Sequence, residues 1–166
     1  TSCSEKLDFN QIEDFVFEPV LTASLTYFTV KPFQFFDADG NQNNTKEEIT
    51  GFDAFSNSFF ENNVVKIKFN AAFKNEFDRS VKIQVDFLDV DNKLLYSFTP
   101  ILVNRKDLNP EPYEEEIIIS ENPDILNTTQ ARVTASIENT GSQMDPFGSS
   151  EFQFKSSITL FVQSEL

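Results

Sequence analysis

The sequence predicts an all-β protein, an antiparallel β-sandwich of about seven or eight strands in an immunoglobulin-like arrangement. Three observations lead to this prediction. Apolar and polar residues alternate with a period of two in several segments, polar turns separate those segments, and no stretch has a strong helical periodicity. With 166 residues, 20 of them Phe, the chain is also large enough to bury a sizeable core.

Four segments have the clearest strand pattern. In each of them, every second residue is apolar, which is typical of a strand with one buried face. These segments are 65–73, 81–87, 132–138 and 152–163. Three further strands are predicted at 21–27, at 94–99 and at 115–120, and Pro100 ends or bends the second of these.

The connections favour antiparallel pairing. Residues 75–80 form a polar link between two of the clear strands, and Asp91-Asn92 separates two others. Because Asp and Asn tolerate positive φ, we predict a tight hairpin there. The segment 49–60, which holds four Phe, has two interpretations: a short helix, or a loop pressed onto the core. We expect one sandwich domain over 15–166, preceded by a polar tether over 1–14.

The composition excludes several kinds of chemistry. The chain has no His and one Cys, so it lacks Ser-His-Asp catalysis, His-bound zinc and an intramolecular disulfide. Its 27 Asp and Glu against 13 Lys and Arg give a formal net charge of −14, which opposes nucleic-acid binding. Paired carboxylates remain in principle, but no Trp and 3 Tyr are available to stack sugars. We therefore expect no enzyme and no nucleic-acid partner.

The one cysteine, Cys3, lies in the segment Thr1-Ser2-Cys3-Ser4-Glu5-Lys6. This segment resembles the end of a bacterial lipoprotein signal peptide, in which small residues precede an invariant cysteine. The resemblance implies a diacylglycerol anchor on Cys3 and removal of the two residues before it. Two or more acyl chains hold a protein stably on a membrane, at about 0.8 kcal/mol per buried CH₂ group. The alternative is a free thiol in a polar tail.

The residues after Cys3 extend the resemblance. In proteobacterial lipoproteins an Asp directly after the cysteine retains the protein at the inner membrane, so Ser4 implies the outer membrane, on its periplasmic or cell-surface face. The Phe-, Asn- and acid-rich composition is similar to that of small, uncharacterised β-sandwich lipoproteins of flavobacteria. Four early acids resemble the surface-export tethers of Bacteroidetes lipoproteins: Glu5, Asp8, Glu13 and Asp14.

Two loops are candidate calcium sites, because calcium takes six to eight oxygen ligands. Four side chains fall at positions 1, 3, 5 and 12 of a calcium-loop pattern: Asp37, Asp39, Asn41 and Glu48. This loop departs from the pattern at position 6, where Gln42 replaces the expected glycine, and no helix is predicted before it. Asp89 and Asp91 flank the predicted hairpin, as calcium ligands do in modules that resemble C2 or cadherin domains. Both loops also fit ordinary surface turns.

The sequence thus favours a non-catalytic lipoprotein of the outer membrane or cell surface. We expect it to act as an accessory or interaction subunit, with an envelope or outer-membrane protein as its partner. The alternative is a calcium- or glycan-binding sandwich module that uses the loops at the ends of the sandwich.

Overall fold

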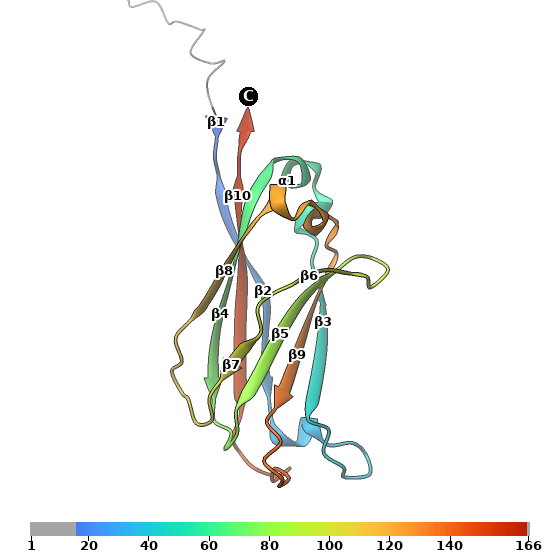
Figure 1. Ribbon diagram of the computed structural model, residues 1–166, viewed down its shortest axis with the longest axis vertical. Coiled ribbons are helices and arrows are strands. Elements are labelled where there is room, and N and C mark those ends of the chain that lie inside the picture. Colours follow the sequence, from blue (N-terminus) through green and yellow to red (C-terminus); the bar gives the residue numbers. More distant parts are fainter. Residues whose placement is uncertain (1–15, 166) are drawn as a thin grey trace, which may run out of the picture.

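A computed structural model of the chain describes residues 16–165 (Figure 1). Cys3 and the predicted tether over 1–14 lie outside the described residues. Two antiparallel sheets pack face to face, so the prediction of an all-β antiparallel sandwich is confirmed. The strands are β1 (Val16–Phe17), β2 (Val20–Val30), β3 (Thr45–Gly51), β4 (Val64–Asn75), β5 (Val81–Leu88), β6 (Leu94–Ser97), β7 (Ile101–Val103), β8 (Tyr113–Ile118), β9 (Gln130–Ile137), β10 (Phe152–Val162) and β11 (Ser164–Glu165).

The strand pairing is nested, as in a long hairpin that has been rolled up. β2 pairs with β10, β3 with β9, β4 with β8, and β5 with β6 and β7. The resulting sheets have the orders β2-β10-β4-β8 and β3-β9-β5-β6. This is the order of a jelly roll, where we had expected an immunoglobulin-like arrangement. The alternation of apolar residues identifies strands, but it does not say which strand pairs with which.

All seven predicted segments contain strands, and four additional strands bring the total over residues 16–165 to eleven. The additional strands are β1, β3, β7 and β11. The ambiguous segment 49–60 contains the end of β3, a 3₁₀ turn, η3 (Ala54–Ser56), and the first half of a short helix, α1 (Ser58–Asn63). The side chain of Asn57 caps this helix by accepting a hydrogen bond from the Phe59 backbone N–H. Three further 3₁₀ segments are η2 (Pro32–Phe35), η4 (Ile119–Glu121) and η5 (Pro123–Asn127).

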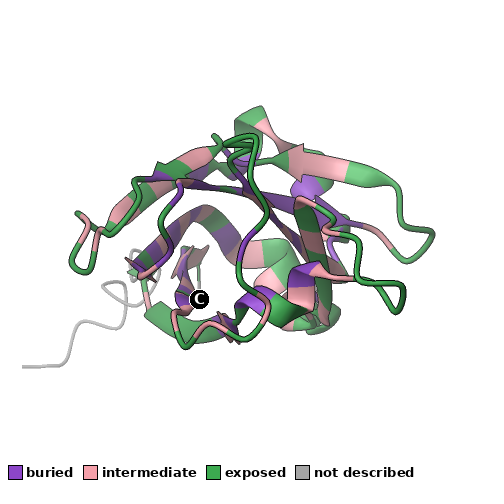
Figure 2. Ribbon diagram, turned by 90° about the horizontal axis from the view of Figure 1, so that it is seen from below, coloured by how far each residue is buried: buried purple, intermediate pink, exposed green. Residues whose placement is uncertain are grey.

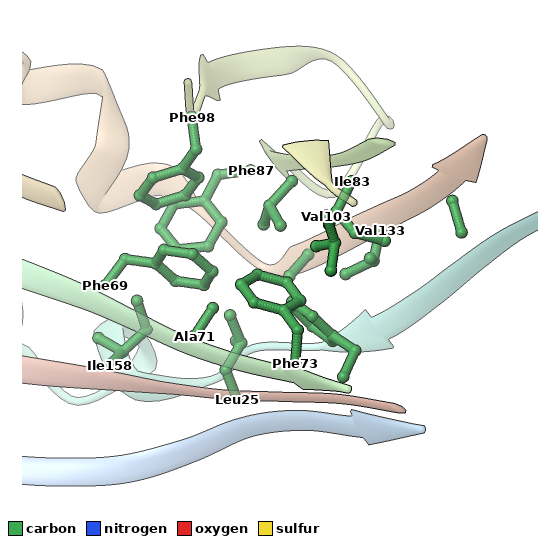
Figure 3. Packing of buried hydrophobic residues seen from close by; sticks show 14 of the residues in the cluster. Leu25, Phe69, Ala71, Phe73, Ile83, Phe87, Phe98, Val103, Val133 and Ile158 are labelled. Carbon is green, nitrogen blue, oxygen red and sulfur yellow. The ribbon is translucent and has the colours of Figure 1, made fainter. Parts of the chain in front are cut away.

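The core lies between the two sheets and is rich in Phe. Seen along the strands, the buried residues line the space between the sheets, while the loops are exposed (Figure 2). Rings from both sheets meet at its centre (Figure 3). The Phe69 ring centroid of β4 lies 4.6 Å from that of Phe98, and the Phe98 centroid lies 5.0 Å from that of Phe87 on β5. The high Phe content therefore fills the core and joins the two layers.

A buried polar group holds the loops at one end of the sandwich. The side chain of Asn75, fully buried at the end of β4, donates to the carbonyl oxygens of Arg79 at 3.0 Å and Asn104 at 2.9 Å. Its own oxygen accepts from the Phe77 backbone N–H at 3.0 Å. Arg79 is also buried, and its Nη1 donates to the carbonyl of Ser142 at 3.0 Å. Loops from three parts of the chain are thereby joined.

Candidate interaction surface

The outer face of the β2-β10-β4-β8 sheet carries apolar residues at one end. The register places one residue from each strand in a row across this face: Val20, Phe161, Lys66 and Ile118. A shift in register between β10 and β4 leaves Val65 as an extra residue of β4 beside this row, and it is 43% exposed. We call Val20, Val65, Ile118 and Phe161 the apolar patch.

The apolar patch lines a groove of about 450 Å³. Val20 is 59% exposed and Ile118 is 39% exposed, although both are large apolar residues. The Nζ atom of Lys66 lies 4.2 Å from the centroid of the Phe161 ring and 3.3 Å from Oε1 of Glu116. An apolar surface with a polar rim of this kind is typical of a site where a partner docks.

The outer face becomes polar away from this end. In the next row, the hydroxyls of Thr22 and Thr159 hydrogen-bond at 2.9 Å. Lys68 is in the same row, and its Nζ lies 3.4 Å from Oε2 of Glu114 in the following row. The apolar patch is therefore confined to one end of the sheet rather than spread over the face.

The chain enters the sandwich at the same end. β1 and β11 pair through Val16 with Glu165 and Phe17 with Ser164, and they continue the β2–β10 ladder beyond the sandwich. Figure 1 shows this two-stranded ribbon projecting from the end of the molecule. Val16 and Phe17 are 40% and 45% exposed, so the ribbon at this end also carries exposed apolar side chains.

Sequence reasoning did not identify the apolar patch, although a signal for it is present. At this end of each of the four strands, two apolar residues are adjacent, so that both faces of the sheet are apolar there. The pairs are Val20-Leu21, Val64-Val65, Ile117-Ile118 and Leu160-Phe161. Each pair is short, and the register that aligns the four pairs is not visible in the sequence.

The first candidate calcium loop is a turn closed by its own carboxylate. Oδ1 of Asp37 accepts from the backbone N–H groups of Asp39 at 2.9 Å and Asn41 at 2.8 Å, and Oδ2 accepts from the Asn41 amide at 3.2 Å. The hydrogen bonds from Asn41 are the main reason why the pKa of Asp37 lies below its usual value. Glu48 lies outside this turn, on β3, opposite Val133.

The second candidate loop is the predicted hairpin between β5 and β6, and its tight turn is confirmed by Asn92 at φ 62°. Oδ1 of Asp89 accepts from the backbone N–H groups of Asp91 at 2.9 Å and Lys93 at 2.8 Å. The two loops adjoin opposite ends of β5, about 20 Å apart along the strand direction. Among residues 16–165, no group of three or more Asp, Glu or Cys is placed to hold a metal ion.

These contacts lead to a prediction about calcium. We expect the melting temperature to be the same, within about 1 °C, in millimolar calcium and in excess chelator, because a ligand specific to the native state must stabilise it. Differential scanning calorimetry measures this directly. A calcium-dependent rise of several degrees that is lost in Asp37→Asn, but kept in Asp89→Asn, would contradict the prediction and place the ion in the first loop.

A second polar cluster closes the β6–β8 side of the sandwich. Oε1 of Glu115 accepts from the Tyr96 hydroxyl at 3.2 Å, and Oε2 accepts from the Tyr113 hydroxyl at 2.8 Å and from the Thr99 backbone N–H at 3.1 Å. Burial, followed by the negative charge of Glu115, raises the pKa of Tyr96 to about 12. The cluster ties an edge of one sheet to an edge of the other.

We expect the ionisation of Tyr96 in this cluster to lower the free energy of unfolding at high pH. Folding raises the pKa of Tyr96 above that of the unfolded chain, so its stabilising contribution is complete below about pH 10 and is lost toward pH 12. Ultraviolet titration of tyrosinate should reveal one group that ionises near pH 12. In Glu115→Gln the same group should ionise at lower pH, because a negative charge next to the phenol is gone. An unchanged titration in that variant would contradict the assignment.

No helix within residues 16–165 is long and apolar enough to cross a membrane. No protein-family model matches the chain, and no curated protein matches it.

Similar folds exist among solved structures. The chain is similar to a "putative secreted protein" of Parabacteroides distasonis, with 13% identity and a TM-score of 0.51, over 70% of this chain and 38% of that one. It is also similar to the VP2 subviral particle protein of infectious bursal disease virus, with 12% identity and a TM-score of 0.48, over 87% of this chain and 32% of that one. The chain thus spans only about a third of the length of either protein. The likeness to the Parabacteroides protein shows the fold alone.

Proposed function

We propose that this protein is a non-catalytic interaction subunit of a bacterial outer membrane, anchored by a lipid on Cys3 and docked on an envelope protein through the apolar patch. The observation that carries the proposal is the position of the patch. Val20, Val65, Ile118 and Phe161 lie at the end of the sandwich where β1, the first described strand, leads into β2.

The anchor and the patch would act together. Residues 4–15 separate Cys3 from Val16, and the extended chain between these two residues spans at most about 45 Å. A patch held within this distance of the membrane meets membrane proteins at a high effective concentration, so a modest apolar contact is enough for stable docking. The similar structure from Parabacteroides is named as a "putative secreted protein", which is in keeping with a place outside the cytoplasm.

Site-specific photo-crosslinking in the native cell envelope tests this proposal. A photoreactive phenylalanine at Ile118, within the apolar patch, should crosslink to one envelope protein. The matched control is Tyr27, which is 57% exposed and lies on the same outer face, opposite Lys155 and away from the patch. Equal crosslinking from both positions, or none from Ile118, would reject the docking proposal.

The anchor has its own test. Mass spectrometry of the protein extracted from membranes should show acyl chains on Cys3, and Cys3→Ser should release the protein into the soluble fraction. An unmodified Cys3 in the native protein would reject the anchor while leaving the docking surface open to the crosslinking test.

A further inference from the structure

The four outer edges of the two sheets differ in how well they are protected against pairing with another chain. Unpaired edge strands attract other strands, and proteins block them with charges, prolines, bulges or shortness. β8 carries three consecutive glutamates, Glu114–Glu116, and β3 carries Lys46, Glu47 and Glu48. β6 and β7, which share the remaining edge of that sheet, have only four and three residues.

β2 is the least protected of these edges. It is eleven residues long, contains no charged residue and no proline, and pairs within the described residues on one side only, with β10. A shift in register at Leu25 interrupts the strand and divides it into two halves. In the second half, Phe28 and Val30 line a gap with Lys46 and Glu48 of the opposite sheet, so this half is partly covered.

The first half, Val20–Ser24, is open in two ways. All five of its residues are exposed, and no strand within residues 16–165 pairs with the backbone groups on its free side. Its inward-facing residues are also uncovered. Leu21 is 41% exposed although its partner on β10, Leu160, is only 6% exposed, and Ala23 is exposed beside buried Ile158. The core layer of the sheet therefore continues to an edge that no other element of residues 16–165 covers.

We propose that Val20–Ser24 accepts an extended, positively charged segment of the partner protein as an additional strand, an inference that rests on the proposed docking function. Such a strand would satisfy the free backbone groups and cover Leu21 and Ala23. It would also lie directly beside Val20 of the apolar patch, so that one partner covers both surfaces.

Charge selects this occupant over a second copy of the chain. Two copies each carry a formal net charge of −14 and repel one another, whereas a segment with Lys or Arg is attracted. The exposed acid Glu18 stands just before β2, and its Oε1 accepts from Nε2 of Gln163 at 3.3 Å, so it places a negative charge beside the apolar patch. β2 itself has no charge to repel a Lys or Arg residue.

Nuclear magnetic resonance of the full 166-residue chain with defined peptides tests the inference. The probes are peptides of about nine residues, long enough for one strand, with alternating Val and Thr. The first has Lys at both ends, the second has Glu at both ends, and the third has the Lys ends and a central Pro, which removes a backbone donor. The Lys-ended peptide should shift the backbone amides of Val20–Ser24, and the other two should bind about tenfold more weakly or not at all.

A matched pair of variants controls for charge. Ala23→Lys places a charge on the open edge and should abolish binding of the Lys-ended peptide. Ile49→Lys makes the same change in net charge at a residue that is 49% exposed on β3, and binding should be nearly unchanged. Equal effects of the two variants, shifts centred elsewhere, or equal affinity for the three peptides would overturn the inference.

Two further outcomes separate the alternatives. Dimerisation of the free chain with protection of the Val20–Ser24 amides would make a second copy the occupant and would overturn the inference. Crosslinking from Ile118 in the native envelope, together with no crosslinking from Ala23, would keep the proposed docking function and reject strand addition. Crosslinking to the same protein from both positions supports both.

Discussion

Replacing Phe69 by Ala is expected to lower the free energy of unfolding by about 3–5 kcal/mol, the range typical of a large aromatic residue removed from a core. Phe69 is fully buried, and its ring meets Phe98 and Tyr113, with centroid distances of 4.6 Å and 6.2 Å. Its loss leaves a cavity between the two sheets that surrounding strands cannot close. Equilibrium urea unfolding followed by circular dichroism measures the change.

Phe147 provides the matched control for Phe69, because its side chain is 94% exposed. Phe147→Ala should change the free energy of unfolding by less than about 0.5 kcal/mol. If Phe69→Ala and Phe147→Ala lowered the free energy of unfolding equally, the prediction that a core Phe contributes more stability than a surface Phe would be wrong. A loss below about 1 kcal/mol in Phe69→Ala would show that the sheets repack around the gap.

The second large effect is expected at Asn75. In Asn75→Ala, the carbonyls of Arg79 and Asn104 and the N–H of Phe77 lose their side-chain partner in a buried site. An unsatisfied buried polar group costs about 1–3 kcal/mol, so we expect a total loss of at least about 3 kcal/mol at neutral pH. Urea unfolding of the two proteins measures the difference.

Asn75→Asp makes this prediction specific. An aspartate accepts from the Phe77 N–H but, when ionised, donates nothing to the two carbonyls. Burial favours the neutral acid, which donates one hydrogen bond, so this variant should regain stability relative to Asn75→Ala as the pH falls from about 7 to 4. Asn109→Asp, at an exposed position, is the control. A constant difference between the two Asn75 variants across this range would contradict the assigned hydrogen bonds.

The extent to which the sequence predicts the fold depends on how each strand is buried. β4, β5, β9 and β10 have one buried and one mostly polar face over most of their length, so the alternation of apolar and polar residues reveals them. β3 does not show this pattern, because it is an edge strand whose sequence, TKEEITG, contains a single large apolar residue. β1, β7 and β11 are too short for any periodicity to show. The nested pairing depends on contacts far apart in the chain, which local patterns do not record.

Local sequence patterns are likewise insufficient to identify the candidate sites. Alternating oxygen-bearing residues predict a calcium loop and a turn equally well, and in the structure Asp37 and Asp89 each hydrogen-bond to the backbone of their own turn. The apolar patch was missed because its residues come from four strands that are up to about 140 positions apart. Each strand contributes a short apolar pair that is unremarkable by itself, and only the register aligns the pairs into one surface.

The ribbon formed by β1 and β11 also determines how the molecule would respond to a pulling force. A force applied at Val16 along the strands, with the sandwich held fixed, passes through β1 into β2, because both strands are already extended. It then acts parallel to the ten pairs of the β2–β10 ladder and loads their interstrand bonds together, in shear, instead of one after another. A pull from the N-terminal side would thus be resisted by one of the longest ladders of the sandwich, while the two pairs of the ribbon would add little resistance.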